Sequence, residues 1–450
     1  MKKFNAVIVG GGSTWTPGLL KSLCVRKDSF PLKRLVMYDI DEQRQKVIGE
    51  FAKVLFSKEY PELEFTYTVN KEEAFQEDLD FVFCQMRTGG YPMREKDEKI
   101  PLSLGVIGQE TCGPGGFAYG LRSIRDMTEL VNDVRKKAMN AWILNYTNPA
   151  AIVAVALERI FPDDKRILNI CDQPENLLRS YGRILGMNHR EFEPIYFGLN
   201  HFGWFTNLYD KKGVDLLPKL REMILTNGFR PADFEQRDKS WLETYATVEQ
   251  IVRDFPDYLP NTYLQYYLYP DKILKKLNPN YTRANEVMDG REKRVFSECA
   301  KVAATQSTKG ANVVVNDAHG EFIILVAESI AYNKGNTFII ITKNEGAIEN
   351  LPEDAMVEVA ASLTANGPKP FRVGKIPTFH KGLIEGQLAY EQLTVDAYVE
   401  KSYQRALEAL TLNRTVVSAK KAREVLDSLI EANKDYWPEL KEEQHTLTMV

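Results

Sequence analysis

The sequence is poor in the residue types that build disulfide frameworks and multi-ligand metal clusters. Its 450 residues include only five cysteines and five histidines, and no two cysteines form a CxxC pair. An odd, sparse set without paired spacing argues against a disulfide framework, so we expect free thiols. Because histidines are so few, any metal site has few nitrogen ligands to choose from.

Long apolar runs and an excess of one charge are also missing. No segment approaches the roughly 20 apolar residues that span a bilayer, and the opening MKKFN leads into a strand pattern instead of a signal peptide. The 58 Lys and Arg against 62 Asp and Glu give a net charge of −4, which creates no field to attract nucleic acid or an acidic membrane. We therefore expect a cytoplasmic enzyme that acts on a small molecule, with no nucleic-acid or membrane partner.

What the chain does have is a glycine-rich turn directly after its first predicted strand. A turn of this kind cradles the pyrophosphate of a dinucleotide, and here it consists of Gly10, Gly11, Gly12, Ser13 and Thr14. Asp39 ends the next predicted strand, where an acidic residue would accept hydrogen bonds from the adenosine ribose. Trp15 occupies the place of the third glycine of the usual motif. By itself the motif leaves dinucleotide binding and a simple strand–helix turn both open.

Strand and helix patterns alternate through the first part of the chain. Apolar runs at residues 3–9, 34–39, 79–84, 141–145 and 166–170 are typical of strands buried on both faces. Their alternation with helix patterns predicts an α/β fold with a Rossmann-type, doubly wound parallel sheet. From Gln85 to Gly120 the rhythm stops, and we expect a long, polar, glycine-rich loop that folds over the site.

The rhythm changes again beyond Ile195, where the segments become longer and richer in aromatic residues. We predict an NAD-binding domain over residues 1–195 and a mixed α+β domain for substrate binding and oligomerisation over 196–450. A helix is expected from about residue 283 to 304. In the last third, helix patterns at 321–333, 395–410 and 419–433 alternate with strand patterns at 337–342, 356–361 and 370–373.

Polar residues at successive strand ends are candidates for chemistry. Cys171 and Asp172 follow the strand at 166–170, and His201 lies some thirty residues later. Thiolate and imidazole favour a soft-to-borderline divalent metal over magnesium or calcium. Taken alone, a buried cysteine is more often a small hydrophobe, and Asp172 could equally cap a helix beginning at Pro174.

Three further segments have both an ordinary and a functional interpretation. Asn148 precedes a proline at the carboxyl end of a strand, where α/β sheets place ligand contacts. Arg283 near a helix start is unfavourable with the helix dipole unless it binds an anion, although such residues are usually solvated charges. Four tyrosines lie within residues 263–269, and such clusters are usually packing.

Together these segments resemble glycoside hydrolase family 4. The resemblance rests on GGGST at 10–14, GQET at 108–111, NYTNP at 145–149, NICD at 169–172 and GLNHFG at 198–203, and it covers nearly the whole chain. Within the family the chain is most similar to the 6-phospho-α-glucosidases. The resemblance implies a lactate or malate dehydrogenase-like architecture, NAD, reducing conditions and a divalent metal. Mn²⁺ is the expected ion, with Co²⁺, Ni²⁺ and Fe²⁺ as alternatives.

The resemblance also implies an oxidative elimination instead of two-carboxylate hydrolysis. NAD would take a hydride from C3 of the sugar, which acidifies the proton on C2, and Cys171 and His201 would hold the metal that stabilises the enolate. Tyr263 would remove the C2 proton, with Tyr266 and Tyr267 as competitors, and Asp172 would protonate the departing oxygen. Water would then add to C1 and the hydride would return.

The family pattern further assigns the sugar phosphate to Arg94, Asn148 and Arg283, with Ser13 as an additional candidate. In this family the residue after the metal cysteine is typically Asp in α-specific and Asn in β-specific members. Asp172 therefore favours a 6-phospho-α-glucoside such as maltose 6'-phosphate, with glucose 6-phosphate as product. The alternatives are a 6-phospho-β-glucosidase and, in other classes, an NAD-dependent hydroxy-acid dehydrogenase or a non-catalytic NAD sensor. We expect a homodimer or homotetramer.

Overall fold

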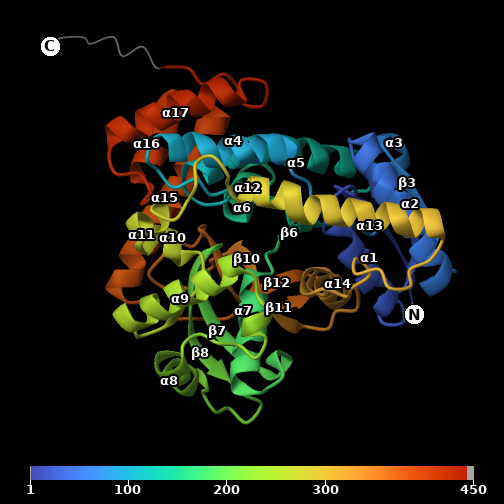
Figure 1. Cartoon of the computed structure of the whole chain (residues 1–450), viewed down its shortest axis with the longest axis horizontal. Helices are drawn as coiled ribbons and strands as arrows, with labels where there is room; N and C mark the ends of the chain where they lie inside the picture. Colours follow the sequence, from blue (N-terminus) through green and yellow to red (C-terminus); the bar gives the residue numbers. More distant parts are fainter. Residues whose placement is uncertain (1, 443–450) are drawn as a thin grey trace.

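The computed structural model describes residues 2–442, and nine of its strands form one large sheet in the order β12-β11-β10-β6-β5-β4-β1-β2-β3 (Figure 1). The strands of this sheet are β1 (Phe4–Val9), β2 (Leu32–Tyr38), β3 (Glu64–Thr68), β4 (Phe81–Cys84), β5 (Trp142–Asn145), β6 (Ile167–Asn169), β10 (Asn336–Lys343), β11 (Met356–Thr364) and β12 (Gly367–Pro370). Strands β1 to β6 pair in parallel. Their order, 3-2-1-4-5-6, is that of the dinucleotide-binding fold, so the predicted doubly wound sheet is confirmed.

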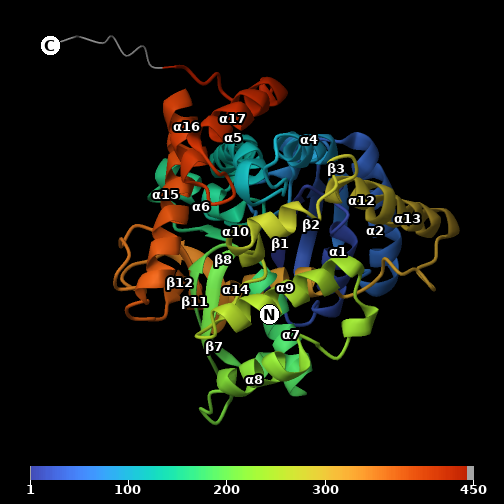
Figure 2. The same cartoon turned by 60° about the vertical axis from the view of Figure 1, so that its left-hand side comes forward.

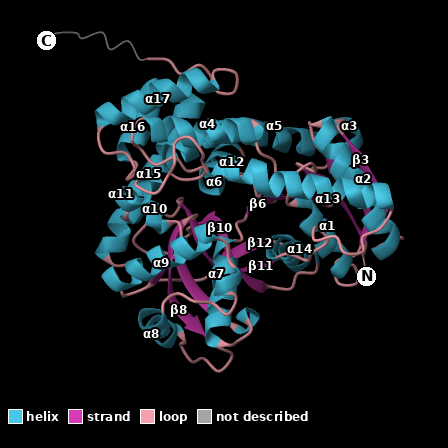
Figure 3. Ribbon diagram, in the orientation of Figure 1, coloured by secondary structure: helices cyan, strands magenta, loops and turns pink. Residues whose placement is uncertain are grey.

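Both faces of the parallel strands are buried, which explains their continuous apolar pattern. Successive side chains of a strand point to opposite faces, and in β1 Ala6 and Ile8 enter one core cluster while Val7 and Val9 enter another. The first face is covered by α1 (Thr16–Val25), α2 (Glu42–Glu59), α13 (Lys293–Thr305) and α14 (Ala318–Ala331). The second is covered by α3 (Lys71–Ala74), α5 (Gly113–Lys137) and α6 (Ala150–Ile160). Figure 3 shows the strands enclosed by these helices.

The second half of the chain extends the same sheet. Strand β10 pairs antiparallel with β6, and β11 and β12 follow antiparallel. The C-terminal helices α15 (Thr378–Glu400), α16 (Tyr403–Leu412) and α17 (Ala419–Asn433) pack on α5 and α6, beside α4 (Gly90–Ser103) in both views (Figure 1, Figure 2). The domain boundary near residue 195 stays a prediction, and the last eight residues of the second domain lie outside the described range.

A smaller sheet of β7 (Glu193–Leu199), β8 (Phe202–Tyr209) and β9 (Leu259–Pro260) packs against β11. The elements around it are α7 (Gln173–Leu185), η1 (His189–Glu191), α8 (Leu217–Asn227), η2 (Phe234–Gln236), α9 (Lys239–Asp254), α10 (Leu264–Leu268) and α11 (Pro270–Leu274). No helix in residues 2–442 is both long enough and apolar enough to cross a membrane.

The predicted loop from Gln85 to Gly120 is wrong, because α4 occupies its centre and α5 begins at Gly113. The buried face of α4 carries charged side chains, among them Arg94, Asp97 and Glu98, so no apolar periodicity marked the helix.

Three other boundaries also differ from the prediction. The helix predicted at 395–410 is interrupted between α15 and α16, where Lys401 has φ 54° and Ser402 caps the next helix. The last strand is Gly367–Pro370 and not 370–373. The long helix after residue 283 consists of α12 (Arg283–Glu286), a π-helical segment η3 (Val287–Glu292) and α13.

Candidate active site

The carboxyl end of the parallel sheet carries the glycine turn. Gly10 has φ 83°, and a Cβ there would lie 2.9 Å from the backbone of Gln85, so this position requires glycine. The amide of Gly12 donates to Asp39 Oδ2 at 2.8 Å, which ties the turn to the end of β2. A Cβ on Gly12 would lie 2.8 Å from Arg44 Cβ, so a side chain at this position would clash with Arg44. These residues fit a dinucleotide, since the turn leads directly into the N-terminus of α1.

Cys171 and His201 come together from different sheets. Cys171 follows β6, and His201 occupies the turn between β7 and β8 with φ 61°. Their Sγ and Nε2 atoms lie 3.5 Å apart, and both side chains are buried. Two such ligands of one ion, each about 2.0 to 2.3 Å from it, would be separated by a little over 3 Å. The pair therefore fits a metal ion, with the remaining positions left to substrate or water.

Burial favours the neutral imidazole of His201, which can bind a metal, but disfavours the thiolate of Cys171. Burial lowers the pKa of His201 to about 4, so its imidazole is neutral and able to act as a ligand near neutral pH. Burial raises the pKa of the Cys171 thiol well above its ordinary value, although a hydrogen bond from Asn200 opposes the shift. Within residues 2–442 no third His, Cys, Asp or Glu joins the pair as a metal cluster.

Tyr263 lies flat on the imidazole of His201. The ring centroids are 3.8 Å apart with an interplanar angle of 2°, and Tyr263 directly precedes α10. Tyr266 is further away, with its ring centroid 6.0 Å from that of Tyr263, and Tyr267 packs on Phe202. Burial raises the pKa of Tyr263 well above its ordinary value. Of the three tyrosines, Tyr263 is the one in ring contact with a predicted metal ligand.

Asp172 occupies the N-cap position of α7, as the alternative interpretation predicts, but its side chain makes no capping hydrogen bond. Its backbone amide donates to the Tyr146 hydroxyl at 3.0 Å, and its Oδ2 lies 3.6 Å from Nδ1 of His319. Burial opposes ionisation of Asp172, but its contacts with His319, Tyr146 and Asn176 together lower the pKa. This shift favours the carboxylate form of Asp172.

Arg94 is buried in a cluster of opposite charges. Its Nε donates to Glu98 Oε1 at 2.8 Å, and a terminal nitrogen lies 3.1 Å from Glu110, which also pairs with Arg87 at 2.6 Å. Although burial raises it, the two guanidiniums hold the pKa of Glu110 down at about 2. Arg94 is thus held by carboxylates and not free for an anion in this arrangement.

Arg283 lies at the start of a helix that contacts this cluster, whereas Asn148 follows β5. Glu98 Oε2 accepts a hydrogen bond from the amide of Ala284 at 2.7 Å, which joins α4 to the start of α12. The side chain of Arg283 is about half exposed and pairs with Glu286 at 2.6 Å. Asn148 precedes a cis proline, and its carbonyl accepts from Ser123 Oγ at 2.8 Å.

Several residues at the site were not singled out from the sequence. His319 was noted only as one of five histidines, and its contact with Asp172 depends on α14 reaching across from the second half of the chain. Glu110 belongs to the GQET segment at 108–111, whose pattern predicts no role for this residue. Glu358 on β11 was missed, although a single carboxylate in an otherwise apolar strand pattern was a usable signal.

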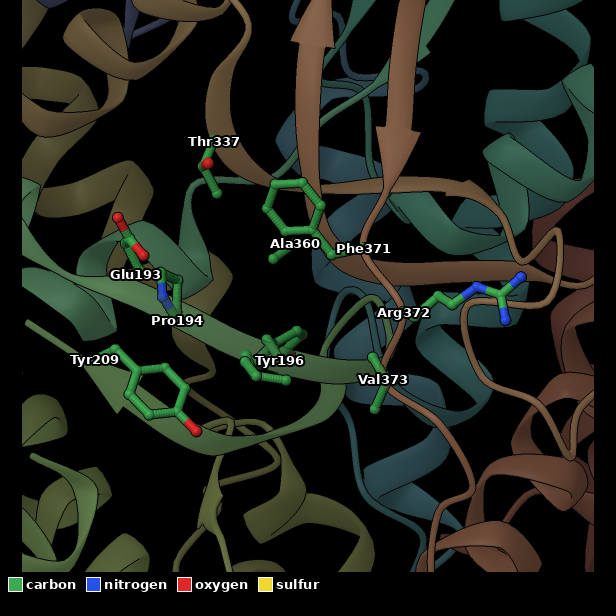
Figure 4. A pocket seen from close by; sticks show the side chains of 10 residues that line it. Glu193, Pro194, Tyr196, Tyr209, Thr337, Ala360, Phe371, Arg372 and Val373 are labelled. Carbon is green, nitrogen blue, oxygen red and sulfur yellow. The ribbon is translucent and has the colours of Figure 1, made fainter. Parts of the chain in front are cut away.

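A separate cavity of about 370 Å³ lies between the small sheet and β10 to β12 (Figure 4). It is lined by Glu193, Pro194, Ile195, Tyr196, Tyr209, Thr337, Ala360, Phe371, Arg372 and Val373. None of the predicted site residues lines it, so this cavity is distinct from the candidate active site.

Two family models match the chain in agreement with this geometry. One, described as family 4 glycosyl hydrolase, matches residues 5–187, and the other, its C-terminal domain, matches residues 196–416. The chain belongs to glycosyl hydrolase family 4. The resemblance inferred from the sequence is thereby confirmed.

Relatives of this family 4 chain share almost its full length. It is 51% identical over 449 residues to phospho-alpha-glucosidase PagL of Clostridium acetobutylicum, covering 98% of this chain and 100% of that protein. A crystal structure of a 6-phospho-alpha-glucosidase from gut microorganisms in complex with NAD and Mn²⁺ has a TM-score of 0.96 at 59% identity, with 98% and 100% coverage. A second, in complex with NAD and glucose-6-phosphate, has a TM-score of 0.94 at 44% identity and the same coverage. The 6-phospho-beta-glucosidase BglT of Thermotoga maritima is more distant, at 31% identity over 95% of this chain and 98% of that protein.

Proposed function

We propose that this family 4 glycosyl hydrolase cleaves 6-phospho-α-glucosides such as maltose 6'-phosphate and releases glucose 6-phosphate, with NAD and a divalent metal as cofactors. One observation carries the proposal: Cys171 and His201 lie 3.5 Å apart beside Asp172 and Tyr263, in a chain 51% identical to a phospho-α-glucosidase. Mn²⁺ is the expected ion, because a relative at 59% identity holds it together with NAD.

The cofactors divide the chemistry with the chain's own residues. When bound, NAD accepts and returns a hydride at C3 of the sugar, while the metal ion polarises the neighbouring hydroxyl oxygens and favours the ionised form of Tyr263. The glycine turn and Asp39 would hold the dinucleotide, and Cys171 and His201 would hold the ion.

Tyr263 is the proposed base. Its ring is held parallel to that of His201 by the stack, which places this tyrosine beside the proposed metal ligand. Oxidation of C3 makes the proton on C2 acidic, and the Tyr263 oxygen takes it. The neighbouring tyrosines lack this fixed relation to His201.

Asp172 is the proposed acid toward the departing glycosidic oxygen. Contacts with His319, Tyr146 and Asn176 lower the pKa of Asp172 against the effect of burial, so the acid role requires that bound substrate favour the protonated form. A sugar that covers the site excludes water and raises the pKa of a buried carboxyl group. Loss of the leaving group is then followed by addition of water at C1.

Arg94, Asn148 and Arg283, with Ser13, are proposed to bind the sugar phosphate. Arg283 is the more accessible of the two arginines, because its side chain is about half exposed and pairs with the exposed Glu286. Exchange of that glutamate for a phosphate would give a bidentate, charge-assisted contact. Arg94 would contribute through the charge cluster that it forms with Glu98 and Glu110.

The α-specific reaction is favoured over the β-specific one by Asp172 and by the higher identity to α-specific relatives. The decisive experiment compares p-nitrophenyl 6-phospho-α- and 6-phospho-β-glucosides, with and without NAD, Mn²⁺ and a thiol reductant. Release from the α-anomer only when all three are present is expected. Release from the β-anomer alone would contradict the anomeric assignment, and net NADH accumulation without release would indicate a hydroxy-acid dehydrogenase.

We further propose that the enzyme is cytoplasmic and forms a homodimer or homotetramer. The five cysteines are all unpaired and buried, which suits a reducing compartment. Light scattering coupled to size exclusion would give the oligomeric state directly.

A further inference from the structure

Glu358 is a buried carboxylate at the junction of the two sheets. It lies on β11 opposite Ile341 of β10, and Ile341 in turn pairs with Asn169, two residues before Cys171. Its side chain is 0% exposed, and no Lys, Arg or His in residues 2–442 forms an ion pair with it. Burial without a cation raises the pKa of Glu358 to about 7, and its hydrogen bonds from Asn200 and Tyr196 oppose that shift.

One carboxylate oxygen holds the turn that carries His201. Asn200 Nδ2 donates to Glu358 Oε1 at 2.8 Å, and Asn200 is the residue directly before His201. The backbone of His201 has φ 61°, in the left-handed region that non-glycine residues rarely adopt. The bond to Asn200 therefore anchors a turn whose backbone is intrinsically unfavourable.

The other oxygen begins a chain of hydrogen bonds to Tyr263. The Tyr196 hydroxyl donates to Glu358 Oε2 at 3.1 Å and accepts from Asn261 Nδ2 at 3.3 Å. Asn261 Oδ1 accepts from the backbone amide of Tyr263 at 3.0 Å. Tyr196 and Asn261 are both fully buried, so water does not compete for these bonds.

We propose that Glu358 is a positioning residue that fixes His201 and Tyr263 relative to each other from the large sheet. Its two oxygens lead to the two members of the stack, whose centroids lie 3.8 Å apart. Groups behind metal ligands commonly set the orientation of those ligands in this way. The inference rests on the proposed function, because it assigns His201 to the metal and Tyr263 to proton removal.

The hydrogen bonds of Glu358 to Asn200, on the side of His201, and to Tyr196, on the side of Tyr263, predict separate effects on metal binding and on proton removal. Glu358→Leu, which removes both acceptor oxygens, should weaken Mn²⁺ binding by about 10- to 100-fold, the range found when groups behind a metal ligand are changed. Tyr196→Phe removes only the hydrogen bonds that lead toward Tyr263, so Mn²⁺ affinity should be unchanged. The variant should have a lower kcat and a larger kinetic isotope effect with substrate deuterated at C2. The matched control is Glu391→Leu, which removes another buried carboxylate, bonded to Gln387 at 2.9 Å on α15, and should leave both readouts unchanged.

Mn²⁺ affinity is measured on the full chain by electron paramagnetic resonance, without substrate, and thermal melting confirms folding. A folded Glu358→Leu chain that binds Mn²⁺ as the wild type does would overturn the proposal. If that variant does not fold, Glu358→Asp, which keeps the charge but shortens the side chain away from Asn200, tests the same contact; weaker Mn²⁺ binding is expected, and unchanged binding would overturn the proposal. Wild type that binds Mn²⁺ but cleaves no 6-phosphoglucoside would overturn the proposed function alone. Wild type that binds no Mn²⁺ would overturn both.

Discussion

The stack of Tyr263 on His201 allows the proposed catalytic role of the Tyr263 hydroxyl to be tested separately from the packing role of its ring. Tyr263→Phe keeps the ring, and hence the contact at 3.8 Å and 2°, but removes the hydroxyl. Proton transfer by a positioned side chain contributes typically about 10²- to 10⁴-fold to rate. We therefore expect kcat of the Phe variant to fall by about that factor with Mn²⁺ affinity unchanged.

Tyr263→Ala removes the ring as well. An aromatic pair contributes about 0.5 to 1.5 kcal/mol beyond its buried area, and each 1.4 kcal/mol is tenfold in an equilibrium constant. If the stack fixes the imidazole for metal binding, the Ala variant should bind Mn²⁺ about 2- to 12-fold more weakly than the Phe variant. The affinities come from titration calorimetry or electron paramagnetic resonance of the substrate-free chain.

Kinetics of the two variants completes the test. Substrate deuterated at C2 should show a larger isotope effect in the Phe variant, because proton removal becomes more strongly rate-limiting. A Phe variant with kcat close to that of the wild type would refute Tyr263 as the base. Tyr266→Phe, which changes a neighbouring tyrosine whose ring does not stack on His201, serves as the control.

Other perturbations reach the acid, the metal and the charge clusters. Asp172→Asn should lower kcat about 10²- to 10⁴-fold for maltose 6'-phosphate. The loss should be far smaller for the p-nitrophenyl substrate, because its leaving group needs no acid. Equal losses of kcat for the two substrates would exclude the acid role. Cys171→Ser should weaken Mn²⁺ binding, since a serine hydroxyl stays protonated, while NAD binding followed by fluorescence stays unchanged. Asp97→Asn leaves the buried guanidinium of Arg122 without its carboxylate and should cost about 3 to 5 kcal/mol in unfolding free energy, a loss that adding Arg122→Met should partly reverse. The pKa of Glu110 is about 2 instead of its ordinary 4.5, so the ionised Glu110 stabilises the fold fully above pH 4.5 and this stabilisation disappears as the pH falls toward 2. The difference in melting temperature between wild type and Glu110→Gln should therefore narrow between pH 4.5 and 2. A difference that stays constant would contradict the assignment.

Local pattern was sufficient where a structural element is defined by its own residues. The parallel strands are apolar on both faces, so their pattern is plain, and α17 was predicted at the bounds the structure shows, Ala419–Asn433. Helix α4 was missed for the opposite reason. Its buried face is charged, and those charges are compensated by Arg122 and Glu110 on other segments, which no local pattern reveals.

The sequence by itself determined the Rossmann-type sheet, the glycine turn and the family, because each is carried by short segments whose residue types are required by backbone geometry or chemistry. Only the tertiary structure decided which side chains meet. The approach of Cys171 to His201 depends on packing between the two sheets, and the pairing of Asp172 with His319 depends on α14, almost 150 residues later. Such contacts join segments whose separation in sequence carries no periodic signal. They form only when burial of the apolar faces brings the segments together.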